Sequence, residues 1–221
     1  MKKLKENVIP LLFMISIPLL NTFYNILNTS ERGLYSLSTE FDNKLPFIKE
    51  FIIPYVIWYP FVVIFLIYIC VKDKKVYYRT LISINIGLII CYTIFYFYQT
   101  TVIRPEITGN DIFSSIVKIV YSNDNPYNCF PSIHVITTYI VIKGVKSVTD
   151  NKFILKLVNI IGILIIFSTQ FVKQHVILDL LAGSILGETV FTISMLGIYR
   201  EEVLWKKKQF SLLMMKKKLE G

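Results

Sequence analysis

The sequence is poor in residues that bind metals or form disulfides. It has two histidines and three cysteines in 221 residues, with no CxxC motif and no Cys/His cluster. Cys70, Cys91 and Cys129 belong to segments that we expect at different membrane depths, which makes them poor disulfide partners. No cluster of carboxylates is present to bind a metal. We therefore expect no disulfide scaffold, no metal and no cofactor.

Charged residues are also scarce. They make up 18% of the chain, whereas 54% is hydrophobic and the mean hydropathy is +0.56. These values are too apolar for a soluble domain of this size and indicate a membrane protein. Apolar runs of about 20 residues can cross a bilayer as helices. The predicted spans are Val8 to Leu27, Phe51 to Val71, Thr80 to Tyr98, Pro131 to about Val148, Phe153 to Val172 and His175 to Tyr199.

The fourth run is the least regular, because Lys143 and Lys146 interrupt its far end. Long basic side chains can nevertheless extend to the interface. The fold class predicted is all-α, a six-span transmembrane helix bundle in one domain of residues 1–199. We expect residues 200–221 to form a basic cytoplasmic tail.

The net charge of +9 follows the expected topology. Most lysines and arginines lie in the N-terminal segment, between the second and third spans, between the fourth and fifth spans, and in the tail. Six crossings put these segments on one side, which the positive-inside rule makes cytoplasmic. We expect both termini in the cytoplasm of an integral, multi-pass membrane protein. No folded basic domain exists for nucleic acid, so membrane lipids are the expected partners, although the tail can equally be a charged solvated segment.

The second outer loop, residues 99–130, contains a helical pattern. Ile112, Ile116 and Val120 form one stripe, and Asn110 or Asp111 can cap its start. This pattern predicts a short helix on the outer membrane surface. It can cover a site or simply pack on the bundle, and the sequence favours packing.

Three polar segments meet on the outer face in this topology: "QTTVIRPE", "NPYNCFPSIHV" and "STQFVKQHVILD". Both histidines of the chain are among them. The candidate residues that they bring to this face are Arg104, Ser132, His134, Lys173, His175 and Asp179.

The residue types in these segments suit phosphate chemistry. His175 and Asp179 are four residues apart, which puts them on one helical face and leaves one imidazole nitrogen free as a nucleophile. Pro131 suits a first helical turn, so the hydroxyl of Ser132 and the amide groups of Ser132 and Ile133 can bind an anion.

Two cations can complete an oxyanion cradle, since Arg104 offers a fork that matches phosphate and Lys173 adds a point charge. Taken singly, these residues can also be interfacial anchors or a helix-stabilising pair. Asp179 is harder to explain structurally, because it lies about a turn inside a span. Glu188 is deeper in that span, and no role for it follows from the sequence.

At these residues the chain resembles the type 2 phosphatidic acid phosphatase superfamily, which includes the vanadium haloperoxidases. The family pattern is lysine, six residues and Arg-Pro; then Pro-Ser-Gly-His; then Ser-Arg, five residues, His, three residues and Asp. The matching residues are Arg104, Pro105, Pro131, Ser132, His134, Ser168, His175 and Asp179. The motifs span residues 99–190 and are specific as a set.

Three positions depart from the family pattern. Phe97 stands at the lysine, Ile133 at the glycine and Thr169 at the arginine. Two cations are therefore lost, and we expect Lys173 to compensate, with Gln99 adding a neutral hydrogen bond to phosphate. This form of the motifs is closer to the branch that contains inositol phosphorylceramide synthase.

The resemblance implies double displacement at phosphorus. His175, oriented by Asp179, attacks and forms a phosphohistidine, and His134 acts as acid and then base. Arg104, Ser132, Ile133, Lys173 and Ser168 are the implied phosphate ligands. The expected function is a lipid phosphate phosphatase on the extracytoplasmic face. Two alternatives stay open, a phosphotransferase of the same mechanism with an alcohol acceptor and a non-catalytic lipid-binding or transport protein.

The implied roles predict a bell-shaped dependence of kcat/KM on pH. The nucleophilic imidazole must start neutral and the acid imidazole protonated, so activity falls on both sides of an optimum. Phosphate release measured across a buffer series tests this prediction. Activity that stays flat from about pH 4 to 9 would contradict both histidine roles.

Overall fold

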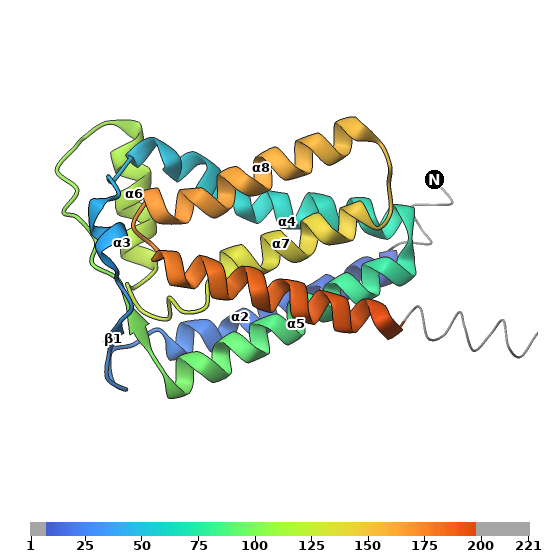
Figure 1. Cartoon of the computed structure of the whole chain (residues 1–221), viewed down its shortest axis with the longest axis horizontal. Coiled ribbons are helices and arrows are strands. Elements are labelled where there is room, and N and C mark those ends of the chain that lie inside the picture. Colours follow the sequence, from blue (N-terminus) through green and yellow to red (C-terminus); the bar gives the residue numbers. More distant parts are fainter. Residues whose placement is uncertain (1–7, 198–221) are drawn as a thin grey trace, which may run out of the picture.

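The computed structural model describes residues 8–197, and they form a bundle of helices (Figure 1). The predictions for the N-terminal lysines, the end of the last span and the basic tail lie outside these residues. The elements are η1 (Phe13–Ile15), α2 (Ser16–Leu27), β1 (Tyr35–Ser36), α3 (Glu40–Lys44), η2 (Lys49–Phe51), α4 (Ile52–Lys72), α5 (Lys74–Phe97), β2 (Thr100–Thr101), α6 (Ile112–Asn123), α7 (Ile133–Lys146) and α8 (Lys152–Phe171). A further helix, Ile177–Gly197, follows α8 and is called the final helix here.

Five helical segments are long and apolar enough to cross a membrane. They are Val8–Leu27, Lys49–Lys72, Lys74–Phe97, Lys152–Phe171 and Ile177–Gly197. The third begins earlier than predicted, because Asp73 caps it by accepting a hydrogen bond from the Val76 amide at 3.0 Å. These long apolar helices indicate an integral membrane protein.

The helix predicted as the remaining span, α7, has only 14 residues and is not among these five. It contacts α4, α5 and α8, and most of its side chains are buried, including Ile136 and Ile140. A helix that its neighbours surround needs little apolar length facing lipid. The sixth membrane span therefore stays a prediction.

The two ends of the bundle are built from different segments of the chain. The hydroxyl of Tyr77 donates to the carbonyl of Pro10 at 2.9 Å, and Gly197 packs against the guanidinium of Arg79, so both ends of the described chain meet the start of α5. The opposite end carries α3, α6 and the longer loops (Figure 1). Both histidines lie toward that loop-rich end.

A small sheet departs from the all-α expectation. Strands β1 and β2 pair in parallel, with Tyr35 opposite Thr100 and Ser36 opposite Thr101. The amide of Tyr35 donates to the carbonyl of Gln99 at 3.0 Å. Strands of two residues are too short to show an alternation of apolar and polar side chains, so the sequence pattern does not predict them. The sheet joins residues 28–50, which the predicted topology makes the first outer loop, to the segment that leads to Arg104.

Close helix packing in the core depends on glycine. A Cβ on Gly144 of α7 would lie 2.7 Å from the hydroxyl of Thr80 and 2.8 Å from the Cδ1 of Ile69. A side chain there would push α7 away from both α4 and α5. The absence of a side chain at Gly144 therefore allows α7 to run through the centre of the bundle.

We expect Gly144→Leu to lower the free energy of unfolding by about 1–3 kcal/mol, because the added carbons overpack this contact. Thermal unfolding in detergent micelles measures the change. The control is Lys146→Leu on an exposed position of the same helix, with an expected change within about 0.5 kcal/mol. Equal stability of the two variants would contradict the packing described for α7.

Candidate active site

His175 lies in a loop between α8 and the final helix. The loop folds back on the end of α8, because the amides of Gln174 and His175 both donate to the carbonyl of Thr169, at 2.9 and 3.1 Å. The side chain of Gln170 donates to the carbonyl of His175 at 2.9 Å. These three hydrogen bonds hold the backbone of the histidine.

The expectation that His175 and Asp179 share a helical face is wrong, because the final helix begins at Ile177. The contact forms in another way. Asp179 lies in the first turn, and its Oδ2 reaches back to the Nδ1 of His175 at 3.2 Å and accepts from the amide of Val176 at 2.9 Å. Asp179 is fully buried. The carboxylate therefore orients the ring through Nδ1, and this contact between the two side chains is the one that the sequence predicted.

His134 lies in the first turn of α7. Ser132 is the N-cap and accepts from the amide of Val135 at 3.4 Å, while its own amide donates to the carbonyl of Asp179 at 3.3 Å. The backbones that carry the two histidines are thus bonded to each other. The imidazole of His134 packs on Tyr55 and Trp58, with ring centroids 4.6 and 4.3 Å apart.

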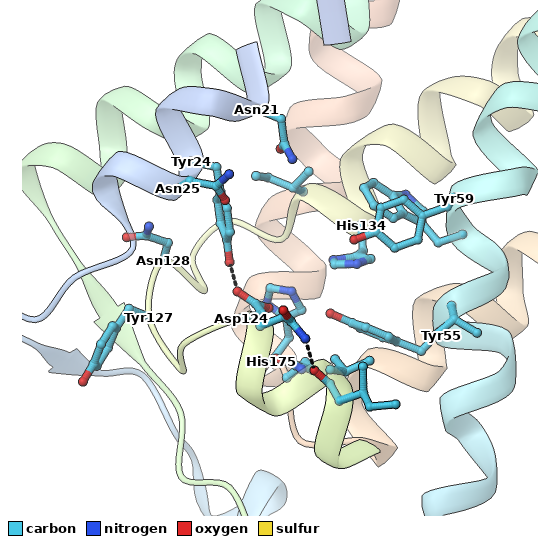
Figure 2. Close-up of a pocket in the computed structure, with 17 residues that line it drawn as sticks. Asn21, Tyr24, Asn25, Tyr55, Tyr59, Asp124, Tyr127, Asn128, His134 and His175 are labelled. Carbon is cyan, nitrogen blue, oxygen red and sulfur yellow. Dashed lines mark hydrogen bonds between the residues drawn. The ribbon is translucent and has the colours of Figure 1, made fainter. Parts of the chain in front are cut away.

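The two imidazoles face one pocket, and their ring centroids are 5.8 Å apart. This pocket, called here the histidine pocket, has a volume of about 240 Å³. Figure 2 shows His134 near Tyr55 and Tyr59 on one side, with Tyr24 and Asn128 on the other. Two side chains that are 41 residues apart in the sequence thus meet around one small volume.

The lining of the histidine pocket contains many polar side chains but few charged ones. Its amide side chains are Asn21, Asn25, Asn123, Asn128 and Gln174. Asp124 is a carboxylate in the lining and accepts from the hydroxyl of Tyr24 at 2.5 Å (Figure 2). Among the residues described, no lysine or arginine lines this pocket.

The two expected cations, Arg104 and Lys173, line a second pocket of about 260 Å³. His175 lines both pockets, so the cations and His134 lie on different sides of it. In this structure the groups expected to form one cradle are therefore divided between two neighbouring pockets.

The guanidinium of Arg104 is held by neighbouring oxygen atoms. It donates to the carbonyl of Asp124 at 2.6 Å and to the side-chain oxygen of Gln174. It also lies over the ring of Tyr121, 4.5 Å from the centroid. Burial raises the pKa of Tyr121 to about 12, with Arg104 opposing the shift, so this hydroxyl stays protonated and donates to the carbonyl of Val172 at 2.8 Å.

The ammonium of Lys173 binds the first outer loop. It donates to the carbonyls of Asp42 and Leu45 at 2.9 and 2.7 Å. The backbone φ of Lys173 is +51°, a left-handed conformation that turns the side chain toward α3. Burial lowers the pKa of Lys173, and the charge of Asp42 partly offsets this effect. These contacts give Lys173 a structural role next to His175.

The side chain of Asp42 makes a second contact between α3 and the segment that contains His175. Its Oδ1 accepts from the amide of Ile177, the first residue of the final helix, at 2.8 Å. The helix α3 is itself held by a capping box between Thr39 and Asp42. The first outer loop is therefore fastened to both ends of the segment that contains His175.

The remaining expected phosphate ligands are distributed differently. Ile133 lines the histidine pocket. The hydroxyl of Ser168 donates to the carbonyl of Ile165 at 2.6 Å, within α8. The side-chain Nε2 of Gln99 donates to the carbonyl of Leu27 and to the side-chain oxygen of Asn128, both at 2.8 Å. Gln99 thus lies behind Asn128, which itself lines the pocket.

Two of the residues that depart from the family pattern lie in surroundings that the structure defines. Phe97 is 79% exposed on the bundle surface, and the hydroxyl of Thr169 donates to the carbonyl of Ile166 at 2.7 Å. Glu188 is bonded to Tyr139 at 2.8 Å and to Lys143 at 3.0 Å, away from the histidines. Glu188 therefore pairs with polar groups in the bundle.

The surface helix predicted in the second outer loop is α6, and Asp111 caps it. It both packs on the bundle and covers the site. Val117 is buried against Ile52, Tyr55 and Val172, while Ile119, Val120 and Asn123 line the histidine pocket. The two alternatives that the sequence left open are thus both realised.

Several residues of the pocket were not identified from the sequence. Tyr55 and Trp58 lie within an apolar span, where aromatic residues carry no functional signal. Gln174 precedes His175 directly, and this adjacency was the only available signal for it. Asn128 and Asp124 belong to the loop before α7, whose course depends on tertiary contacts.

The comparisons with known proteins agree with this geometry. The family model described as PAP2 superfamily matches residues 51–193, which is more than half of the chain. The chain therefore belongs to the PAP2 superfamily. This membership supports a phosphatase-type enzyme. No curated protein and no solved structure matches the chain.

The position of Lys173 predicts a loss of stability when its donors are removed. Lys173→Met leaves the carbonyls of Asp42 and Leu45 without this partner, so we expect the free energy of unfolding to fall by about 1–3 kcal/mol. Lys173→Arg keeps donors and is the control. Thermal unfolding measures stability, and inhibition by orthovanadate measures anion affinity in the same samples. Unchanged stability with strongly weakened inhibition would instead make Lys173 a direct phosphate ligand.

Proposed function

We propose that this protein is a lipid phosphate phosphatase that acts through a phosphohistidine. The observation that carries the proposal is the pair of imidazoles that face one pocket, with centroids 5.8 Å apart and one ring bonded to a buried carboxylate. Two rings in this arrangement can act on opposite sides of a phosphorus atom. Membership in the PAP2 superfamily supports the same reaction class.

The first chemical step forms the enzyme intermediate. The Nε2 of His175 attacks phosphorus, the bond from phosphorus to the lipid oxygen breaks, and His134 gives its proton to that oxygen. Asp179 stabilises the positive charge that develops on the ring of His175. In the second step His134 takes a proton from water, the water oxygen attacks phosphorus, and the bond from phosphorus to His175 breaks. Inorganic phosphate leaves and both rings return to their starting forms.

Positive potential from the second pocket supports these steps. Arg104 contacts Gln174 directly and Lys173 is two residues from His175, so both charges lie close to the reacting group even though neither lines the histidine pocket. The sign of this potential favours an anion beside His175. The hydroxyl of Ser132 and the amide of Ile133 add the start of α7 to this environment.

A lipid substrate is supported by an apolar groove next to the histidine pocket. The groove has a volume of about 430 Å³, runs between α2, α4, α5 and α7, and shares Asn21, Trp58, Tyr59 and Ile133 with the pocket. Val62, Leu88 and other apolar side chains line the rest of it. A phosphate at the histidines can therefore continue into a hydrocarbon chain in the groove.

The proposed topology puts the reaction outside the cytoplasm. Lys72, Lys74 and Arg79 lie at the junction of α4 and α5, and Lys143 and Lys146 lie near the end of α7. These residues belong to the bundle end opposite the histidines, which the positive-inside rule makes cytoplasmic. Both termini would then be cytoplasmic and the substrate would come from the outer leaflet.

A phosphotransferase of the same mechanism is the second candidate. It is favoured by the neutral hydrogen-bonding groups of the histidine pocket, including Asn21, Asn25, Asn123 and Tyr127. Such groups suit the hydroxyls of an alcohol acceptor, which would take the place of water in the second step. A non-catalytic lipid-binding protein is the remaining alternative, and the experiment below separates all three.

The decisive experiment supplies radiolabelled lipid phosphates to purified protein and traps the acid-labile phosphoenzyme. Label is expected on wild type and absent from His175→Ala, because this variant lacks the proposed nucleophile while His134 serves as the acid and base. His134→Ala is expected to lower the rate by about 10²–10⁴-fold. Orthovanadate should inhibit and EDTA should not.

Three controls define the outcomes. Lys146→Ala changes an exposed residue far from the site and should leave the rate unchanged. Release of inorganic phosphate identifies a phosphatase, and label recovered on an added alcohol identifies a transferase. If no lipid is dephosphorylated and no label is trapped, the protein is not an enzyme of this class.

A further inference from the structure

The orientation of the Gln174 carboxamide follows from its neighbour. Arg104 contacts the side-chain oxygen of Gln174, and a guanidinium only donates hydrogen bonds. The amide oxygen must therefore face Arg104, because the opposite orientation would bring two donors together. The amide nitrogen, Nε2, must face the other way.

The Nε2 of Gln174 has no hydrogen-bond partner within residues 8–197. The residue is only 3% exposed, so bulk water does not solvate this donor freely. A buried donor without a partner costs free energy, and each such group calls for an explanation, such as a catalytic role or a bound water or ion. Gln174 also lines the histidine pocket, directly beside His175 in the sequence.

A second amide in this pocket repeats the arrangement. The side-chain oxygen of Asn128 accepts from Gln99 at 2.8 Å, and its Nδ2 has no partner among the described residues. Asn128 is also 3% exposed and lines the histidine pocket. In both residues a donor from behind fixes the oxygen and leaves the N–H groups as unpaired donors at the pocket.

We propose that Gln174 binds a non-bridging oxygen of the phosphoryl group through Nε2, and so acts as a neutral oxyanion donor beside the nucleophile. This assignment rests on the proposed function and adds a catalytic residue to it. It accounts for the lack of cations in the histidine pocket, because a preorganised amide stabilises charge on oxygen without carrying charge itself. Arg104 then acts on phosphate through Gln174, by fixing the amide and polarising it.

The test replaces the donor while keeping the acceptor for Arg104. Gln174→Glu keeps an oxygen for the guanidinium and removes the N–H group, whereas Gln174→Met removes both. We expect Gln174→Glu to lower kcat/KM by at least about 10²-fold and to weaken orthovanadate inhibition by a similar factor. Its thermal unfolding midpoint should equal or exceed that of wild type, because the introduced carboxylate accepts from Arg104 in place of the amide oxygen.

The relative activities of the two variants separate direct binding of phosphate by Gln174 from a role in which Gln174 only positions Arg104. If Gln174 only holds Arg104, Gln174→Glu should keep most activity and Gln174→Met should lose it. If Nε2 binds the phosphoryl oxygen, Gln174→Glu should be no more active than Gln174→Met. Ser122→Asp, which adds a charge on an exposed part of α6, controls for a general electrostatic effect and should change kcat/KM less than about twofold.

The outcomes also separate this assignment from the proposed function. Wild type that releases no phosphate from lipid phosphates overturns the function. In that case orthovanadate binding, measured by thermal stabilisation, still tests Gln174. Wild-type kcat/KM and wild-type orthovanadate affinity in Gln174→Glu would overturn the assignment while leaving the phosphatase intact.

Discussion

The contact between Asp179 and His175 is the interaction on which the site depends. A fully buried carboxylate in the first turn of the final helix accepts from the imidazole and from the amide that follows it. A buried carboxylate is costly unless it is paired. The start of the final helix and the loop that carries His175, called here the histidine loop, must therefore keep their relative positions. The carbonyl of the same residue accepts from the amide of Ser132, which connects the loop to α7. One residue thus holds both histidine-bearing segments together.

Further connections reach the site from distant parts of the chain. Asp42 and Lys173 fasten the first outer loop to the histidine loop, and Tyr121 of α6 donates to the carbonyl of Val172. Asp124 contacts Tyr24 of α2 and so brings the first helix to the wall of the pocket. The loop-rich end of the bundle is therefore a set of mutually bonded segments around the imidazoles. Such support keeps catalytic groups near their working geometry.

The sequence predicted the elements whose signals are local. Apolar runs located the long helices to within a few residues except at the start of α5, and the spacing of His175 and Asp179 correctly predicted their contact. The reason given for that contact was wrong, because His175 precedes the helix and the carboxylate reaches back to it. Motif spacing reports which residues meet, but it does not report where a helix begins.

Side-chain direction was the part that the sequence could not supply. Lys173 stands near the nucleophile, yet its left-handed backbone turns the ammonium toward α3. Gln174 gains its role only because Arg104, 70 residues away, fixes its amide oxygen. Ser168 satisfies its hydroxyl within its own helix. Each of these outcomes depends on tertiary partners, and no pattern of nearby residues encodes them.

The most direct test of the central claim is an experimentally determined structure of the protein in a lipid environment with bound orthovanadate. The account predicts vanadium bonded to the Nε2 of His175, with His134 within hydrogen-bond distance of a vanadate oxygen on the opposite side. Vanadate bound between Arg104 and Lys173 without contact to His134 would contradict it. So would imidazole rings that line two separate pockets.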